Sequence, residues 1–139
     1  MGTLRAVPLD ARQAPTPSPL ILIVDDNLDS REMYSTYLAH AGFRALEAAD
    51  GESGIAQAEG RRPALIVMDA AMPGLDGWEA ARRLKSSPGT MTIPVIMLTS
   101  HAFAEHRDRA AAVGADLFLA KPILPDELAR HISRLLRRS

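Results

Sequence analysis

The sequence predicts a doubly wound α/β domain in which five helices cover both faces of a five-stranded parallel sheet. Short apolar runs of strand length alternate with segments of helical periodicity from residue 20 to the end of the chain. Several runs are apolar at every position, which is typical of strands that are buried on both faces. Because parallel strands need helical crossovers, this alternation implies one sheet between two layers of helices.

The individual elements follow from local patterns of apolar, capping and turn residues. We expect strands at residues 20–24, 44–49, 65–68, 95–98 and 117–120. Helices are expected to begin near residues 27, 50, 76, 101 and 125. Glycine ends helices readily, and Gly42, Gly60 and Gly114 are expected to end the first, second and fourth of them. In the third helix we expect Trp78 to face the core and Lys85 to point outward.

The composition limits the classes of function. With 16 basic and 17 acidic residues the formal net charge is -1, which provides no overall field for binding DNA or an anionic membrane. Cysteine is absent, which excludes disulfides and thiolate metal sites, and no apolar stretch reaches the roughly 20 residues of a membrane span. We therefore expect a cytoplasmic protein with no membrane partner and no direct DNA binding.

Residues 1–19 differ in composition from the rest of the chain. They contain Pro8, Pro15, Pro17 and Pro19, show no hydrophobic period and lack the apolar core of a signal peptide. Such a segment cannot bury enough surface to offset the entropy that ordering would cost. We expect a disordered lead at residues 1–19 and one folded domain at residues 20–139.

Functional side chains stand where the expected strands end. Asp25 and Asp26 follow the first strand, Asp69 the third, Thr99 the fourth and Lys121 the fifth. In a parallel sheet these ends meet at one edge, where ligands bind. Taken singly, the aspartates and the threonine would be interpreted as helix caps and the lysine as a solvated charge. Their convergence on one edge is what indicates a site.

The chemistry of this group of side chains indicates phosphoryl binding. Carboxylates held close together repel one another unless a cation lies among them, and hard oxygen ligands suit Mg²⁺. A phosphoryl group fits beside such a cation, because Lys121 and Thr99 offer donors to its oxygens and Asp69 is left as the nucleophile. The glycine-rich patterns GxGxxG and GxxxxGK are absent from the sequence, so a nucleotide cradle is not expected.

Four sequence blocks carry a resemblance to a known family. They lie at residues 23–27 (IVDDN), 67–77 (VMD followed by MPGLDG), 93–100 (IPVIMLTS) and 114–122 (GAD through KP). In this order and spacing the chain resembles the receiver domains of bacterial two-component response regulators, from residue 20 to about residue 137. The resemblance implies a flavodoxin-like (CheY-like) fold.

The resemblance also implies roles for the residues at the strand ends. Asp69 is expected to accept a phosphoryl group from a phosphohistidine of a sensor histidine kinase or phosphotransfer protein. Mg²⁺ is expected to bind Asp25 or Asp26, Asp69 and the backbone carbonyl of Ala71. In this family such a domain catalyses only its own phosphorylation and dephosphorylation, so turnover of a separate substrate is not expected.

Further positions of the family pattern concern phosphoryl binding and switching. Thr99 and Lys121 are expected to hold the phosphoryl oxygens, and Phe118 stands where the family places its switch aromatic. The peptide bond between Lys121 and Pro122 is expected to be cis. Two positions that set the dephosphorylation rate in the family are Ala71 and His101 here, and they leave that rate open.

Signalling is expected to pass through one face of the domain, made of residues 101–113, 116–120 and the final helix. Its charges are mixed in sign, a pattern that suits a protein partner or a second copy of the chain better than DNA. These charged residues are Glu105, Arg107, Asp108, Arg109, Asp126, Glu127, Arg130 and Arg134.

Three alternatives accompany the expected stand-alone receiver. A receiver fragment of a larger regulator or hybrid kinase would have the same sequence features. A Mg²⁺-dependent phosphatase with an aspartyl nucleophile also uses acids and a lysine at strand ends, but its nucleophile precedes its acidic pair, and here the order is reversed. A scaffold that is not phosphorylated would usually lack a site residue, and none is missing here.

Overall fold

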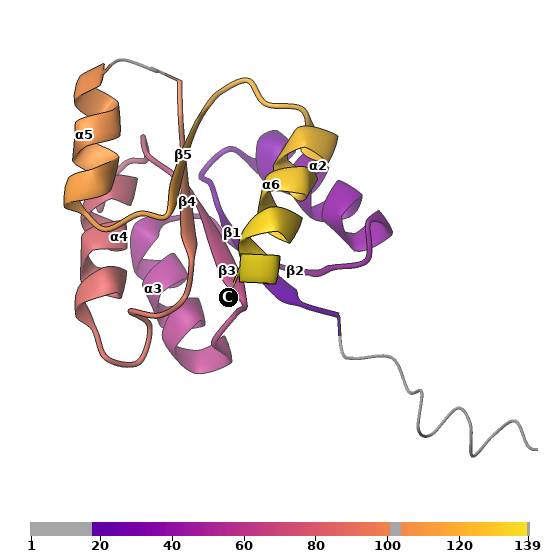
Figure 1. Cartoon of the computed structure of the whole chain (residues 1–139), viewed down its shortest axis with the longest axis horizontal. Coiled ribbons are helices and arrows are strands. Elements are labelled where there is room, and N and C mark those ends of the chain that lie inside the picture. The colour runs from indigo at the N-terminus through magenta and orange to yellow at the C-terminus, as the bar shows by residue number, and fades with distance from the viewer. Residues whose placement is uncertain (1–17, 101–103, 139) are drawn as a thin grey trace, which may run out of the picture.

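The computed structural model describes residues 18–100 and 104–138. Figure 1 shows one sheet with helices on both sides. The strands are β1 (Leu20–Val24), β2 (Arg44–Ala48), β3 (Leu65–Asp69), β4 (Val95–Thr99) and β5 (Leu117–Ala120). The helices are α2 (Leu28–His40), α3 (Gly51–Arg61), α4 (Gly77–Ser86), α5 (Ala104–Ala112) and α6 (Pro125–Arg138). All strand pairs are parallel and the sheet order is β2-β1-β3-β4-β5, so the predicted fold class is confirmed.

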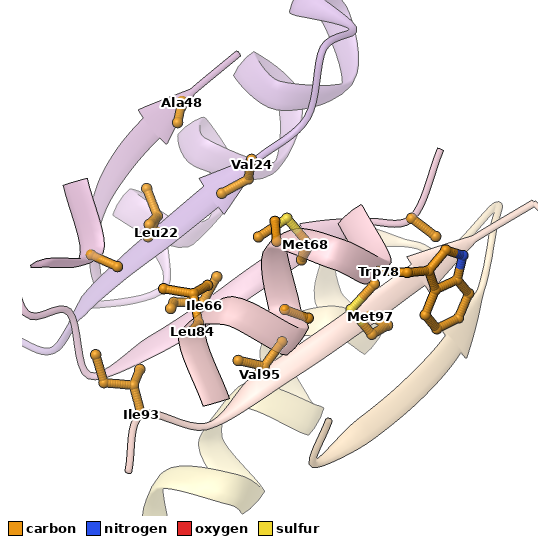
Figure 2. Close-up of a cluster of buried hydrophobic side chains, with 14 of the residues drawn as sticks. Leu22, Val24, Ala48, Ile66, Met68, Trp78, Leu84, Ile93, Val95 and Met97 are labelled. Atoms are coloured by element: carbon orange, nitrogen blue, oxygen red, sulfur yellow. The ribbon is translucent and has the colours of Figure 1, made fainter. Parts of the chain in front are cut away.

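The sheet separates two apolar cores, because successive strand residues point to opposite faces. Helices α3, α4 and α5 cover one face and helices α2 and α6 the other (Figure 1). On the first face, strand residues pack against Trp78 and Leu84 of α4 (Figure 2). The strand residues of this core are Leu22, Val24, Ala48, Ile66, Met68, Val95 and Met97. Those of the second core are Ile21, Ile23, Leu65, Val67, Ile96 and Leu98.

Side-chain caps begin several helices as the sequence predicts. The Asp50 carboxylate accepts a hydrogen bond from the Ser53 N–H at 2.7 Å, and the Asp76 carboxylate accepts one from the Glu79 N–H at 2.8 Å. The expected end of the second helix at Gly60 is wrong, because α3 continues to Arg61. Arg62 closes this helix in the left-handed region (φ 44°), so a glycine was not required there.

The expected outward orientation of Lys85 is also wrong. Its ammonium lies 2.9 Å from Asp116 Oδ2 and donates to the carbonyl of Ile93 at 2.7 Å. The segment between α4 and β4 folds back over the end of α4. The Met91 and Ile93 carbonyls of this segment therefore face Lys85, which donates to them. Helical periodicity does not reveal such a loop path. Trp78, by contrast, is buried as predicted.

Some expectations concern residues outside the described ranges. The expected disordered lead lies mostly there, as does His101. Ser18 and Pro19 are described, and their carbonyls accept hydrogen bonds from the side chain and backbone of Arg44 at 2.9 Å each. Within residues 18–100 and 104–138, no helix has the length and apolar character needed to cross a membrane.

Candidate functional site

The carboxyl ends of four strands bring the predicted side chains together at one edge of the sheet. Strand β3 lies between β1 and β4, which places Asp69 centrally. Carboxylate oxygens of Asp25, Asp26 and Asp69 lie within 4.8 Å of one another. From the end of β5, Lys121 places its ammonium 3.3 Å from Asp25 Oδ2 and 3.7 Å from Asp69 Oδ2. The result is a compact acidic cluster with one cation at its side.

Hydrogen bonds to or from the backbone hold Asp25 and Asp69 in place. The Asn27 N–H donates to Asp25 Oδ1 at 2.9 Å, and the Arg31 guanidinium donates to the Asp25 carbonyl at 2.8 Å. The Ala71 N–H donates to Asp69 Oδ1 at 3.3 Å. Asp25 and Asp69 are buried, whereas Asp26 is exposed, so the cluster opens to solvent on the side of Asp26.

Gly77 is a site residue that sequence reasoning treated only as a helix start. Its N–H donates to the Ala70 carbonyl at 3.0 Å. A Cβ atom added at this glycine would overlap the Asp69 carbonyl oxygen. The first turn of α4 therefore packs directly against the backbone that carries Asp69, and only glycine permits this approach.

Burial and neighbouring charges set the protonation of Asp69. Desolvation raises the pKa of its carboxyl to about 6, Lys121 opposes this rise, and the charges of Asp25 and Asp26 add to it. Burial by itself would lower the pKa of the Lys121 ammonium, but Asp69 and Asp25 together outweigh that effect and the pKa is raised. Lys121 is therefore charged at neutral pH and only partly neutralises the three acids.

The donor set fits a hard divalent cation. Three carboxyl groups lie in a small, partly buried volume with the Lys121 ammonium beside them, which leaves room for a further positive charge. Oxygen ligands at this density are those that Mg²⁺ prefers, with water completing its coordination. Among residues 18–100 and 104–138, neither histidine nor cysteine belongs to this cluster, and its all-oxygen ligands favour a hard metal over a softer one.

Thr99 and Phe118 lie on the adjacent strands β4 and β5, where Thr99 is paired with Ala120 and Phe118 with Met97. Thr99 is buried at the end of β4, and its carbonyl accepts a hydrogen bond from the Lys121 N–H at 2.7 Å. The Phe118 ring is half-buried and stacks against Trp78, with ring centroids 6.5 Å apart. The bond between Lys121 and Pro122 is cis, as predicted. The switch role of Thr99 and Phe118 stays a prediction.

Tyr34 is a neighbour of the site to which the sequence pattern assigned no role. Its hydroxyl donates to the carbonyl of Ile123 at 3.0 Å, two residues beyond Lys121. The ring itself is buried. The sequence carries no signal for the hydroxyl contact, because it joins two segments that are 89 residues apart.

Comparison with known proteins identifies the class. The sequence matches the response regulator receiver domain family over residues 21–133, and the chain belongs to this family. It is 41% identical over 119 residues to the phosphate regulon transcriptional regulatory protein PhoB of Pseudomonas aeruginosa, covering 86% of this chain and 52% of that protein. It is 39% identical over 137 residues to a gliding motility regulatory protein of Myxococcus xanthus, covering 97% of this chain and 18% of that protein.

Solved structures agree with the assignment. The chemotaxis protein CheY4 of Vibrio cholerae superposes with a TM-score of 0.81 at 32% identity, over 84% of this chain and 98% of that one. The receiver domain of a sensor histidine kinase from Pseudomonas aeruginosa superposes with a TM-score of 0.79, also at 32% identity, over 86% of this chain and 98% of that one. That structure has a magnesium ion coordinated in its active-site cleft.

Proposed function

We propose that Asp69 accepts a phosphoryl group from a phosphohistidine of a sensor histidine kinase or phosphotransfer protein. The observation that carries this proposal is the position of the Asp69 carboxylate, central in the acidic cluster and 3.7 Å from the Lys121 ammonium. In the reaction, an Asp69 carboxylate oxygen forms a bond to phosphorus while the bond from phosphorus to the histidine nitrogen breaks. The imidazole keeps the electron pair of that bond and then takes up a proton.

The surrounding residues complete the proposed reaction site. Asp25, Asp26, Asp69 and the backbone carbonyl of Ala71 would hold Mg²⁺, and the magnesium ion in the related kinase receiver supports this choice of metal. When bound, the ion supplies positive charge that offsets both the carboxylates and the phosphoryl oxygens. Lys121 adds a second positive charge to the same oxygens, and the buried Thr99 adds a hydroxyl donor.

The donor protein docks on the apolar rim beside the site. Leu28, at the start of α2, exposes 53% of its surface, and Met33 and Leu124 expose 45% and 62% of theirs. Met33 and Leu124 also line a cavity of about 680 Å³ to which Lys121 contributes. An apolar surface next to a charged reaction centre suits a partner that must bury its own apolar side chains to bring a phosphohistidine to Asp69.

The phosphorylated domain signals through the face formed by α5, β5 and α6, to a protein partner or a second copy. The chain spans about half the length of the PhoB relatives that it matches. Those relatives are named as transcriptional regulatory proteins. For this chain, two statements stay predictions: that it does not bind DNA directly, and that it acts as a stand-alone receiver. We also propose that the domain does not turn over a separate substrate.

Intact mass after incubation with acetyl phosphate and Mg²⁺ tests the proposal. The parent protein should gain one phosphoryl group and Asp69→Asn should gain none, because an amide oxygen is a poor nucleophile. The matched control is Asp108→Asn, an exposed aspartate on α5 that should be labelled like the parent. Labelling of Asp69→Asn, or repeated turnover of p-nitrophenyl phosphate by the parent, would contradict the proposal.

A further inference from the structure

Tyr34 connects helix α2 to the loop that follows β5. Its side chain belongs to the core between the sheet, α2 and α6, and only 3% of its surface is exposed. The hydroxyl at the end of this buried ring donates to the Ile123 carbonyl at 3.0 Å. The ring also lines the cavity beside the acidic cluster, together with Lys121 and Pro122. Tyr34 therefore touches the segment that carries the site lysine.

Two hydrogen bonds flank the position of Lys121 in this segment. On the strand side the Lys121 N–H donates to the Thr99 carbonyl at 2.7 Å. On the other side the Ile123 carbonyl accepts from Tyr34. Pro122 lies between them and has no N–H with which to anchor the backbone. The tyrosine hydroxyl thus supplies the attachment on the far side of the lysine, before α6 begins at Pro125.

The hydroxyl lies close enough to the site to feel its charges. Burial raises the pKa of the Tyr34 phenol, the Lys121 ammonium opposes the rise, and the charges of Asp25 and Asp69 add to it. These are the same charges that surround the Lys121 ammonium. Tyr34 and the acidic cluster therefore share one electrostatic environment, although the tyrosine does not belong to the cluster itself.

We infer that Tyr34 is a positioning residue for phosphoryl binding. By holding the Ile123 carbonyl, it keeps the loop in the path that places the Lys121 ammonium between Asp25 and Asp69. Without that hydrogen bond the loop gains freedom, and the ammonium spends less time where a phosphoryl oxygen binds. The inference rests on the proposed function of the site. It concerns phosphoryl binding and not metal binding, because the carboxylates of the cluster lie at the ends of β1 and β3 and not in the loop after β5.

Tyr34→Phe removes the hydroxyl and keeps the ring that fills the core. Beryllofluoride is a mimic of the phosphoryl group, and its affinity is measured by titration at saturating Mg²⁺. The affinity for Mg²⁺ alone is measured in a separate titration. We expect beryllofluoride to bind about 3- to 10-fold more weakly, the range for loss of one buried hydrogen bond. The Mg²⁺ affinity should change by less than about twofold, because Tyr34 touches no carboxylate of the cluster.

Tyr37→Phe is the matched control, because it makes the same change on the same helix at an exposed position. Both of its affinities should equal those of the parent. Unchanged beryllofluoride affinity in Tyr34→Phe would overturn the inference, and so would an equal loss of both affinities, which indicates general loosening of the core. A parent protein that binds no beryllofluoride would contradict the proposed function instead.

A double-mutant cycle tests whether Tyr34 acts through the lysine. Lys121→Met should weaken beryllofluoride binding by itself. Adding Tyr34→Phe to that variant should cause no further loss, because the ammonium that the tyrosine positions has been removed. A further loss as large as that measured with Lys121 present would overturn the inference.

Discussion

At the scale of single residues, the protonation of the Asp69 carboxyl depends on its surroundings. Its carboxyl has few solvent contacts, two acidic neighbours and one ammonium nearby. Desolvation raises its pKa to about 6, so the metal-free site is partly protonated under mildly acidic conditions. A cation among the carboxylates favours the ionised form and with it the nucleophile.

The ¹³C NMR titration of the Asp69 carboxyl should show a midpoint near pH 6 in metal-free protein, and added Mg²⁺ should lower it. Because this pKa lies above its ordinary value of 3.8, the folded state binds the proton more tightly than the unfolded state does. The contribution of Asp69 to the free energy of unfolding is therefore present at low pH and falls as the pH rises from about 4 through about 6. Asp69→Asn should lack both the resonance and this part of the pH dependence. A midpoint below pH 4 without metal would contradict the prediction.

At the scale of elements, Lys85 fastens α4 to the strands that follow it. Its ammonium contacts Asp116 Oδ2 at 2.9 Å and the Ile93 carbonyl at 2.7 Å, and Asp116 also accepts from the Val95 N–H at 2.8 Å. This network joins the end of α4 to the starts of β4 and β5. Only 13% of the lysine side chain is exposed, so the interactions are screened less than those of a surface pair.

Lys85→Met should lower the free energy of unfolding by about 1–3 kcal/mol, because it leaves the Ile93 carbonyl without its side-chain donor and removes the ion-pair partner of Asp116. Urea denaturation followed by circular dichroism measures this change. Arg82→Met is the control on the same helix, since its exposed ion pair with Glu79 faces solvent. The control should move the midpoint less than Lys85→Met does, and a larger effect at Arg82 would contradict the prediction.

At the scale of the whole molecule, aromatic stacking joins the sheet to the expected signalling face. Trp78 of α4 stacks on Phe118 of β5, and the Arg109 guanidinium of α5 lies 5.0 Å from the centroid of a Trp78 ring. Arg109 also lies 3.8 Å from Asp76, the residue that caps α4. A shift of the Phe118 ring on β5 would therefore alter its contact with Trp78 of α4 and, through Trp78, the contact with Arg109 of α5.

Beryllofluoride with Mg²⁺ should change the fluorescence of Trp78 and shift amide NMR signals along α5, β5 and α6. The physical reason is that a ligand populates the conformation that it binds better, and Phe118 is expected to reorient in that conformation. The same addition to Asp69→Asn should produce neither change. Shifts confined to the loops around Asp69 would contradict a signal that reaches the α5, β5 and α6 face.

Local patterns were sufficient for the class of fold and the main features of the site. Runs such as residues 65–68 are apolar throughout because both faces of the strand are buried, and this property is visible without knowing any neighbour. Asp25, Asp69 and Lys121 were predictable as a group because parallel strands share one edge, whatever their order in the sheet. Local patterns do not give the strand order, which only the resemblance to a flavodoxin-like fold implied.

Contacts between distant segments were decided only by the tertiary structure. Lys85 turned inward because the following loop folds back over it, and Tyr34 reached Ile123 because α2 packs beside the last loop. Gly77 is required because α4 starts against the Asp69 backbone, a closeness that a turn pattern does not measure. The sequence by itself thus determined the fold class and the residues at the sheet edge. The packing of loops and helices, which depends on contacts far apart in the chain, determined what holds those residues in position.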